Sequence, residues 1–501
     1  MSASLRNNAS SGSEPPDRHK NSVAVLAPNR PGMRFFVAIP HSRPGLRGEL
    51  AIGSATHSKF ARRSEFLVGE LELVVFGQES MTPKSPILGS MVQGTSTELA
   101  FEQDVAPHPS RRGQQVGAVV VGGDYQGLGI VRSLGRHGVP VCVIDNEHSI
   151  SRYSRYCAHF VRCPDLREEA STIRTVMRVV EDLKLHGWVL YPTREEHVAA
   201  FSRHRSELSK LLRVPTPPWD VVQWAWDKRN TYRLAQELAI PTPATKYFTG
   251  NDLDRKLDGL MPPFVVKPAI KEHFIYATKA KAWCANGRDE LKDLFQKASD
   301  LVGPEEVIVQ ELIPGTGSQQ YSYCAFFANG EAIGKMVARR RRQHPLQFGK
   351  ASTYVETVDI PRLEELSERF LRAVDYYGLV EVEYKLDPRT SEYKLLDVNA
   401  RTWGYHSIGS RAGVDFSYML YADQVGLSVT PCKSDSGIGW VRMTTDVPAA
   451  LMGLMAGEFD LKSYFQSLRN CNVEAVFSPE DPLPGLAEIL LIPYLAVKRG
   501  F

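Results

Sequence analysis

The sequence predicts a mixed α/β protein in which a Rossmann-like layer precedes a larger α+β region. Two patterns support this fold class. Apolar strands alternate with helical segments between residues 116 and 213, as a doubly wound parallel sheet requires. Between residues 383 and 401, two short strands carry acid and amide side chains at alternate positions, which is typical of a hairpin with one polar face.

The front layer starts at residue 116 with an apolar strand, a glycine-rich turn and a helix. In order, the expected elements are a strand at 117–121, a turn at 122–127, a helix at 128–137, strands at 139–145 and 188–191, and a helix from 195 to about 204. This alternation of strands and helices makes the first part of the chain Rossmann-like.

A dinucleotide site in this layer is not favoured. Asp145 closes the second strand, where an acid that binds a ribose would stand. The glycine spacing does not fit, because a register that starts at Gly127 and Gly129 places Arg132 at the third glycine position. Glycines that only allow a tight passage from strand to helix are therefore the preferred interpretation over an NAD or FAD site.

A second region follows three prolines between residues 215 and 218. It opens with a helical pattern at 219–239 that is broken around Asp227. The next expected elements are strands at 244–248, 264–267, 279–284 and 307–310 with a helix at 288–299, then strands at 321–328, 331–339 and 353–358 and a helix at 362–376. The tail after Pro431 is expected to form a smaller α-rich appendage without a chemical role.

The composition is that of an ordinary soluble protein of 501 residues. A net charge of +3 is too small to indicate nucleic acid or an anionic membrane as a partner. Seven cysteines without a CxxC pair argue against a disulfide framework and a zinc site, so a reducing cytoplasm is the expected location. No apolar run approaches the ~18 residues of a spanning helix, since Pro493 interrupts the longest one.

Residues 1–115 do not read as a secretory signal, because the first part of the chain lacks an apolar core segment. The excess of basic residues through Arg63 resembles a transit peptide only loosely. We expect a disordered or wrongly translated extension and assign it no function.

The acid and amide side chains of the hairpin predict a metal site. Alternation in a strand places Asp397, Asn399 and Arg401 on one face, and a turn across residues 388–392 would bring Glu383 over the same surface. Two carboxylates and an amide oxygen are ligands that Mg²⁺ accepts beside phosphate oxygens. An arginine next to them stabilises charge on a phosphoryl group. An exposed edge hairpin with ordinary surface charges is the alternative.

Two lysines precede the hairpin in positions that suit a polyphosphate. Lys228 starts a helix, and Lys267 ends an apolar strand, so that its stem is held while the ammonium reaches a ligand. Solvated surface charges are the alternative for both.

The segment 307–315 predicts a contact with adenine. An apolar strand there ends in Gln310 and Glu311, and Pro314 and Gly315 follow soon after. Backbone N–H and C=O groups just beyond such a strand are expected to be unpaired, and the edge of an adenine ring can satisfy them.

Four consecutive arginines, Arg339 to Arg342, also require an interpretation. In a strand they point alternately to the two faces, so at most one pair can enter a cleft. We favour a pair that lines a phosphate or carboxylate pocket over a solvated face or a nucleic-acid contact, and no aromatic interleaving supports an RNA surface.

The order of these parts resembles the ATP-grasp superfamily, and most of all its carboxylate-amine ligase branch, which is similar to D-aspartate ligases. The resemblance covers residues 117–429 and rests on the order of loose motifs, which are Asp227-Lys228, Val266-Lys267-Pro268, Gln310-Glu311-Leu312-Ile313-Pro314-Gly315, Glu383, and Leu396-Asp397-Val398-Asn399-Ala400-Arg401.

The resemblance implies a Rossmann-like pre-ATP-grasp domain at 116–213 and an ATP-grasp domain at 214–430, with lobes at about 214–310 and 311–430, followed by the appendage at 431–501. It implies the following site residues: Lys228 and Lys267 on the ATP phosphates, Glu311, Leu312 and Ile313 against adenine, Glu383, Asp397 and Asn399 on two Mg²⁺ ions, and Arg401 beside the transferred phosphoryl group.

Three departures from the family pattern stand out. The segment 268–278 lacks the glycines of the usual phosphate lid, so the lid is different or stiffer, and Lys271 and Lys281 are candidate substitutes. Gln319 or Gln320 stands where relatives place an acid on the ribose. Asp397 replaces the commoner glutamate, which is one methylene longer.

The resemblance implies an ATP-dependent ligase that joins a carboxylate to an amine through an acyl phosphate, with Mg²⁺, or Mn²⁺ in its place. Its partners would be small-molecule carboxylates and amines, with no nucleic acid, no membrane span, and a homodimer left open. A catalytically inactive ATP-binding scaffold or sensor is the alternative. The sequence identifies neither substrate.

Overall fold

A computed structural model describes residues 115–499 of the chain with the exception of 251, 347 and 350. All of these residues belong to one unit that runs from Leu99 to Phe501. The expected N-terminal extension over residues 1–115 lies outside the described residues, apart from Gln115.

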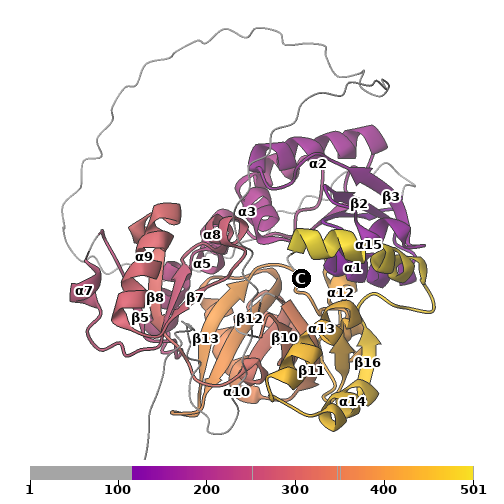
Figure 1. The fold of residues 1–501 in the computed structure, drawn as a ribbon. Helices are drawn as coiled ribbons and strands as arrows, with labels where there is room; N and C mark the ends of the chain where they lie inside the picture. Colours follow the sequence, from indigo (N-terminus) through magenta and orange to yellow (C-terminus); the bar gives the residue numbers. More distant parts are fainter. Residues whose placement is uncertain (1–114, 251, 347, 350, 500–501) are drawn as a thin grey trace, which may run out of the picture. The chain divides into compact units, whose positions relative to one another are not determined.

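The front layer is a sheet of four parallel strands with helices on both faces (Figure 1). The strand order is β3-β2-β1-β4, and every residue of β1, β2 and β4 is buried. The elements are β1 (Ala118–Val121), α1 (Tyr125–Arg136), β2 (Val141–Asp145), η1 (Ile150–Tyr153), β3 (Cys157–Arg162), α2 (Glu169–Leu183), β4 (Val189–Pro192), α3 (Glu195–Arg203) and α4 (Arg205–Leu208). This agrees with the Rossmann-like prediction, whose three expected strands are β1, β2 and β4.

A helix pair and a small antiparallel sheet come next. The helical pattern breaks at Asp227 as expected, because the Asp227 carboxylate caps the second helix by accepting from Arg229 N. The sheet has the order β5-β8-β6-β7. The elements are α5 (Trp219–Trp226), α6 (Lys228–Glu237), β5 (Thr245–Tyr247), α7 (Leu253–Lys256), β6 (Phe264–Pro268), α8 (Lys271–Thr278), β7 (Trp283–Ala285), α9 (Arg288–Val302), η2 (Pro304–Glu306) and β8 (Val307–Glu311).

The rest of the chain forms an eight-stranded sheet with flanking helices. Its main path is β13-β12-β9-β10-β11-β15-β16, and β14 pairs with β10. The elements are η3 (Gly317–Gln319), β9 (Gln320–Ala328), β10 (Glu331–His344), β11 (Ala351–Val358), α10 (Pro361–Ala373), β12 (Gly378–Asp387), β13 (Glu392–Asn399), α11 (Ile408–Arg411), α12 (Phe416–Gln424), β14 (Cys432–Lys433), β15 (Gly439–Val441), α13 (Met443–Met455), α14 (Leu461–Arg469), β16 (Cys471–Glu474) and α15 (Leu483–Arg499).

The residues after 431 are less separate than the expected α-rich appendage. They supply three long helices, but also β14, β15 and β16, which extend the large sheet. These strands are only two to four residues long, so their sequences carry too little alternation to reveal them.

Two of the hydrophobic cores show how the parts are joined. One core combines residues of the front layer, such as Leu128 and Val131 on α1, with Phe326 and Trp403 of the large-sheet region. The small sheet has a core of its own, built from α9 and the inner faces of β6 and β8. The front layer and the large sheet therefore share packing that the small sheet does not.

Candidate functional site

A cleft with about 890 Å³ of open space lies between the small sheet and the β12–β13 hairpin. Its described lining contains three carboxylates, those of Glu311, Glu383 and Asp397. It contains six cationic side chains, which are Lys228, Lys267, Lys271, Lys281, Arg340 and Lys385. Positive groups thus outnumber negative ones two to one, and a cleft of this kind suits a ligand with several negative charges.

The remaining lining is largely apolar and comes from the small sheet, its flanking segments, the hairpin and the segment between β10 and β11. It includes Pro243, Val265, Ala282, Leu312, Ile313, Phe348 and Leu396. A concave site with one apolar region and a few charged groups is the usual form of a small-molecule site.

The predicted hairpin places its polar side chains together. β12 and β13 pair antiparallel with Glu383 opposite Asp397 and Glu381 opposite Asn399. Asn399 Nδ2 donates to Glu383 Oε1 at 2.8 Å and to Glu381 Oε2 at 3.1 Å. Arg401 Nη2 donates to Asn399 Oδ1 at 3.2 Å. The expectation of one shared polar face is therefore confirmed in its geometry.

Glu381 and Glu383 have different environments although they are two residues apart. Burial and the neighbouring Glu383 raise the pKa of Glu381. Burial opposes ionisation of Glu383 too, but Arg340 and Lys281 outweigh it and lower its pKa to about 2. Arg340 Nη2 lies 3.2 Å from Glu383 Oε2. Glu383 is thus the ionised carboxylate of the pair.

Both predicted lysines reach the cleft. Lys228 Nζ lies 2.9 Å from Asp397 Oδ1, and its side chain is 9% exposed, so the alternative of a solvated charge is wrong for this residue. Lys267 Nζ donates to Tyr232 Oη at 2.7 Å, and Tyr232 Oη donates to the Leu396 carbonyl at 2.7 Å. Tyr232 therefore ties the strand lysine to β13.

Helix α8 occupies most of the segment 268–278, where the family resemblance implied a phosphate lid. Lys271 at its first position lies 2.5 Å from Glu195 Oε1, and Arg401 Nη2 donates to the same oxygen at 2.8 Å. Burial would raise the pKa of Glu195, but the cations of Lys271 and Arg401 hold it well below its usual range. One carboxylate of α3 thus joins the start of α8 to the loop after β13.

Glu195→Gln is expected to loosen helix α8. The neutral amide would leave Lys271 and Arg401 without their shared counter-charge, and breaking a buried ion pair costs about 3–5 kcal/mol. Amide exchange in α8 should become at least about tenfold faster, measured by hydrogen–deuterium exchange. Glu207→Gln, which alters a half-exposed carboxylate paired with His204, is the matched control and should leave α8 unchanged. Equal exchange in both variants would show that the Glu195 bridge does not hold the helix.

The four arginines of β10 do not act as two alternating pairs. A register shift between Arg340 and Arg342 places a bulge at Arg341. Arg340 lines the cleft, whereas Arg342 makes two bonds of 2.8 Å to the Asp446 carboxylate on α13. The expectation that a pair enters the cleft is therefore wrong, because the extra residue of a bulge changes the direction of the side chains after it.

The segment after β8 lines the cleft, but its backbone is less open than expected. Leu312 N donates to the Pro263 carbonyl at 3.2 Å, and Glu311 N donates to the Ala244 carbonyl at 3.0 Å. Lys385 Nζ donates to the Ile313 carbonyl at 2.9 Å. The prediction that the groups just beyond the strand are unpaired is wrong for the Leu312 N–H and the Ile313 carbonyl, because strand pairing continues through Glu311, two residues beyond the apolar run. The Glu311 carboxylate is engaged by Arg389 and Lys394.

Gln320, one of the two candidate ribose contacts, lines the cleft and accepts from Arg340 Nη1 at 2.5 Å. The other candidate, Gln319, is not part of the described lining. Lys271 and Lys281, the candidate substitutes for the lid, both line it.

Asp145 in the front layer holds the glycine turn rather than a ligand. Its Oδ2 accepts from Gly123 N at 2.7 Å, and Ser149 and Ser151 both donate to the Gly123 carbonyl at 2.6 Å. A Cβ on Gly123 would lie 1.9 Å from Ser149 Oγ. The turn is filled by protein groups, which agrees with the interpretation that it does not cradle a dinucleotide.

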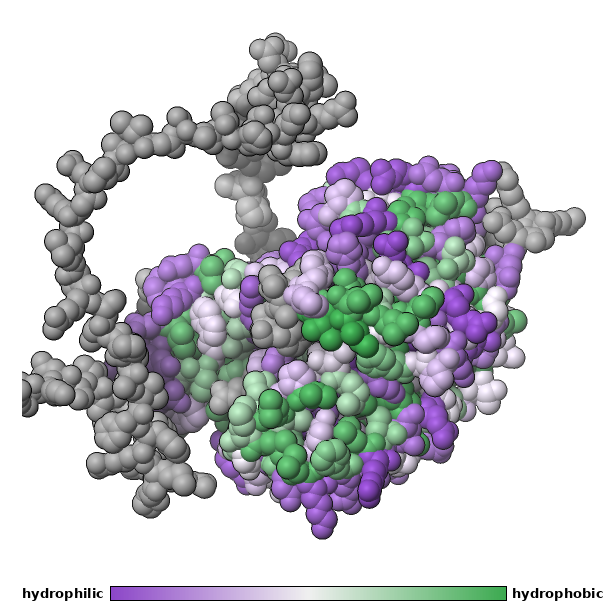
Figure 2. Space-filling model, turned by 45° about the vertical axis from the view of Figure 1, so that its right-hand side comes forward, coloured by the Kyte–Doolittle hydropathy of each residue, from purple (hydrophilic) through white to green (hydrophobic). Residues whose placement is uncertain are grey.

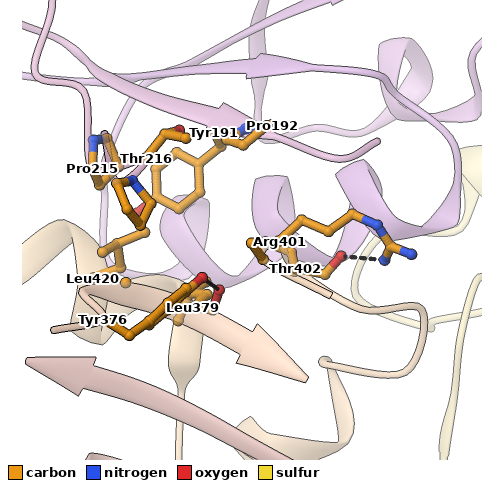
Figure 3. A pocket seen from close by; sticks show the side chains of 12 residues that line it. Tyr191, Pro192, Pro215, Thr216, Tyr376, Leu379, Arg401, Thr402 and Leu420 are labelled. Carbon is orange, nitrogen blue, oxygen red and sulfur yellow. Dashed lines mark hydrogen bonds between the residues drawn. The ribbon is translucent and has the colours of Figure 1, made fainter. Parts of the chain in front are cut away.

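Arg401 and Asn399 lie outside the described lining of the main cleft. Arg401 borders a second, smaller cavity with about 290 Å³ of open space at the front layer. Figure 3 shows its guanidinium turned away from the apolar wall of Tyr191 and Leu420, with a bond of 3.1 Å from Nη1 to the Thr402 carbonyl. Arg401 thus stands at the front-layer side of the hairpin.

Sequence reasoning missed several residues of this site, among them Lys385, Glu381, Glu195 and Tyr232. Glu381 shares the alternation of Glu383, and this signal could have revealed it. Glu195 and Tyr232 are ordinary helix residues in the sequence, and only the folded chain brings them to Arg401 and Lys267.

The oxygen donors of the hairpin fit a hard divalent ion. Among residues 115–499 that are described, no group of three or more His, Cys, Asp or Glu side chains forms a metal site by itself. Glu383 and Asp397 are nevertheless opposite each other, and Asn399 bonds directly to Glu383. Two carboxylates and an amide suit Mg²⁺ when phosphate oxygens complete its shell.

Comparison with known proteins finds one curated protein of similar sequence. The chain is 23% identical to the D-aspartate ligase of Enterococcus faecium (strain Aus0004) over 326 residues, which cover 61% of this chain and 76% of that protein. No protein-family model matches the chain.

Two solved structures have a similar fold. The complex of biotin carboxylase from Campylobacter jejuni with β,γ-ATP superposes with a TM-score of 0.52 at 13% identity, over 62% of this chain and 72% of that one. The biotin carboxylase domain of Hydrogenobacter thermophilus 2-oxoglutarate carboxylase, a dimer with MgADP, ADP and bicarbonate, gives 0.51 at 14% identity, over 62% and 70%. These two structures show a fold that the described chain shares with biotin carboxylases, and the sequence is similar to that of a D-aspartate ligase.

Proposed function

We propose that this chain is an ATP-dependent ligase that joins a carboxylate to an amine through an acyl phosphate. The observation that carries the proposal is the cleft itself, in which six cations and the acidic hairpin face an apolar wall. A nucleoside triphosphate has the matching parts, since its base is flat and apolar and its tail is a polyanion.

The proposed reaction has two steps. A carboxylate oxygen of the first substrate attacks the γ-phosphorus of ATP, the bond to the β-phosphate oxygen breaks, and ADP leaves. The amine nitrogen then attacks the carbonyl carbon of the acyl phosphate, inorganic phosphate leaves, and the nitrogen loses a proton. Catalysis of this kind depends mostly on positioning and on neutralising charge, for which orientation supplies about 7–11 kcal/mol.

The residues of this chain have separate roles in the proposal. Lys228 and Lys267 bind phosphate oxygens, and Leu312 and Ile313 contact the adenine ring. Arg401 stabilises charge on the transferred phosphoryl group from the front-layer side of the hairpin. Glu311, which was predicted to lie against adenine, lines the cleft. Its carboxylate is paired with Lys394, so its backbone groups would make the contact with adenine.

Glu383, Asp397 and Asn399 would hold Mg²⁺, or Mn²⁺ in its place, and the ion would neutralise charge on the phosphate oxygens. Arg340 is the counter-charge of Glu383, and Lys228 is the counter-charge of Asp397. Both carboxylates are therefore already held in the cleft beside cations that also attract phosphate.

The proposed domains are a pre-ATP-grasp domain at 116–213, an ATP-grasp domain at 214–430 with lobes that meet near residue 310, and a C-terminal part at 431–501. All seven cysteines are free thiols, which suits a reducing cytoplasm, the location that we propose. The substrates would be small carboxylates and amines.

The pH dependence of ATP binding should report on Lys267. Burial, with the nearby charge of Lys228, lowers the pKa of Lys267 to about 7. Phosphate favours the charged ammonium, so binding should draw a proton onto Lys267, and affinity should fall as the pH rises above about 7. We expect the Kd for ATP to increase up to about tenfold per pH unit there, measured by titration calorimetry.

Lys267→Arg is the control for this effect, because a guanidinium stays charged throughout that range. Its affinity for ATP should vary little with pH. The same pH profile in both proteins would show that another group titrates.

The proposed reaction can be tested without knowing the substrates. Pools of candidate carboxylates and amines are mixed with the chain, ATP and Mg²⁺, and the release of ADP and phosphate is measured. Hydroxylamine in place of the amine should trap the acyl phosphate as a hydroxamate, with ADP formed in equal amount. ADP release without a hydroxamate for any active carboxylate would contradict the acyl-phosphate route.

An ATP-binding scaffold without turnover is the second candidate. Helix α8 replaces the flexible lid, and its Lys271 is held by Glu195. If this helix cannot adjust, ATP would bind without reacting. Tight ATP binding with no ADP release from any pool would favour the scaffold.

A further inference from the structure

The last helix of the chain, α15, exposes an unusually apolar face. Among its described side chains, six large apolar ones are 38–81% exposed, namely Leu483, Leu486, Ile489, Leu490, Ile492 and Tyr494. Figure 2 shows hydrophobic residues gathered on one face of the molecule. A monomer that is surrounded by water rarely exposes large contiguous apolar patches, and such a patch is typical of an interaction site.

The exposed side chains occupy a wide part of the helix surface. At about 100° per residue, the six exposed positions fall within an arc of about 200° around the helix axis, with Ile492 at one edge and Tyr494 at the other. A helix that packs against one neighbour buries a stripe of about 100°. The arc is thus too wide for contact with a single flat neighbour, and the partner must surround the helix on two sides.

The only acid of α15, Glu488, does not belong to this face. It is fully buried and forms an ion pair with Arg442, the residue that precedes α13. This pair also joins α15 to α13, whose exposed residues Val447, Leu451 and Met455 are apolar as well. Neither helix therefore presents a charged side chain on the described part of its outer face.

Cations lie around the apolar arc. α15 packs against η1, where Arg152 and, just after it, Arg155 are exposed. Lys498 and Arg499 follow the arc in the sequence at the end of the same helix. The acids in this neighbourhood have cationic partners of their own, since Glu480 pairs with Arg136 and Asp481 with Arg132. The small net charge of the whole chain hides this local excess of positive charge.

We propose that α15 binds the surface of an anionic lipid bilayer. The apolar arc enters the boundary between headgroups and acyl chains, and the surrounding cations contact lipid phosphates, as in helices that lie in the plane of a membrane. Among the described residues, no helix is both long and apolar enough to cross a bilayer. Lipid headgroups and acyl chains can rearrange around a helix and contact a wide arc of its surface. A rigid second copy of this chain would contact a narrower arc.

Sedimentation of the full chain with lipid vesicles tests this proposal. The chain should bind vesicles of phosphatidylcholine with phosphatidylglycerol, and should bind pure phosphatidylcholine more weakly. Leu486→Glu with Leu490→Glu should lower the bound fraction at least about tenfold. The matched control is Met261→Glu with Leu301→Glu, two side chains of similar exposure elsewhere on the chain, and it should bind as the unchanged chain does.

The cations and the oligomeric state give further outcomes. Lys498→Ser with Arg499→Ser should remove most of the preference for anionic vesicles. The proposal is overturned if the unchanged chain stays in the supernatant with both vesicle types, or if the Leu486 and Leu490 variant binds equally well. A dimer that this variant dissociates, without vesicle binding, would assign the face to a second copy instead. Circular dichroism shows whether each variant is folded.

Discussion

Lys267→Met should abolish ATP turnover and leave the chain folded. Lys267 lies near the end of β6 and lines the cleft, where its ammonium donates to Tyr232 Oη at 2.7 Å, and in the proposed site it binds the phosphates. Loss of one such stabilising group typically costs about 10²–10³ in kcat. Steady-state assays of ADP release measure the loss, and thermal unfolding shows that stability has not fallen, since methionine fills the space of the lysine stem.

Lys246→Met is the matched control for this variant. Lys246 lies on β5 in the same small sheet, but it is not among the described lining of the cleft. Its ATP turnover should remain near that of the unchanged chain. Near-normal turnover of Lys267→Met would remove Lys267 from the site.

Asp397→Asn should lose activity for two reasons. It removes one of the carboxylates that face the proposed metal, and it leaves the buried Lys228 without its counter-charge at 2.9 Å. The first effect should lower kcat at least about a hundredfold, as expected for the loss of a charged group that acts in the transition state. The second should also destabilise the fold, since a buried cation without its partner costs about 3–5 kcal/mol.

Kinetics at several Mg²⁺ concentrations separate these two effects. A metal-ligand role predicts that more Mg²⁺ is needed for half-maximal rate, whereas a purely structural role predicts a lower melting temperature with an unchanged Mg²⁺ requirement. Glu392→Gln, at an exposed position of the same hairpin, is the control and should change neither quantity.

The sequence was most informative where polar side chains repeat with the period of a strand or mark the start of a helix. The alternation at 383–401 predicted the hairpin, its turn and the grouping of Glu383, Asp397 and Asn399, because side chains two residues apart share a face in any strand. The break at Asp227 was predictable for a similar reason, since an aspartate is a preferred N-cap.

Features that depend on one extra residue or on distant partners were not predictable. The bulge at Arg341 reverses the direction of the following arginine, and no residue type in that run announces it. The bridge from Glu195 to Arg401 joins residues 206 positions apart. The lack of glycine in segment 268–278 predicted a stiffer segment there. The ion pair between Lys271 and Glu195, which fixes helix α8 in place, could not be predicted from the sequence.

The distribution of the hydrophobic cores limits which parts of the chain can move to admit the proposed nucleotide. Because α1 and the large sheet share one set of packed side chains, the two cannot swing apart without exposing residues such as Trp403 to water. The small sheet rests on its own core and can rotate as a rigid body. Opening and closing should therefore be a hinge motion of residues near 245–311, with the chain segments before β5 and after β8 as its pivots, and this motion would have to break the ion pair between Lys271 on α8 and Glu195.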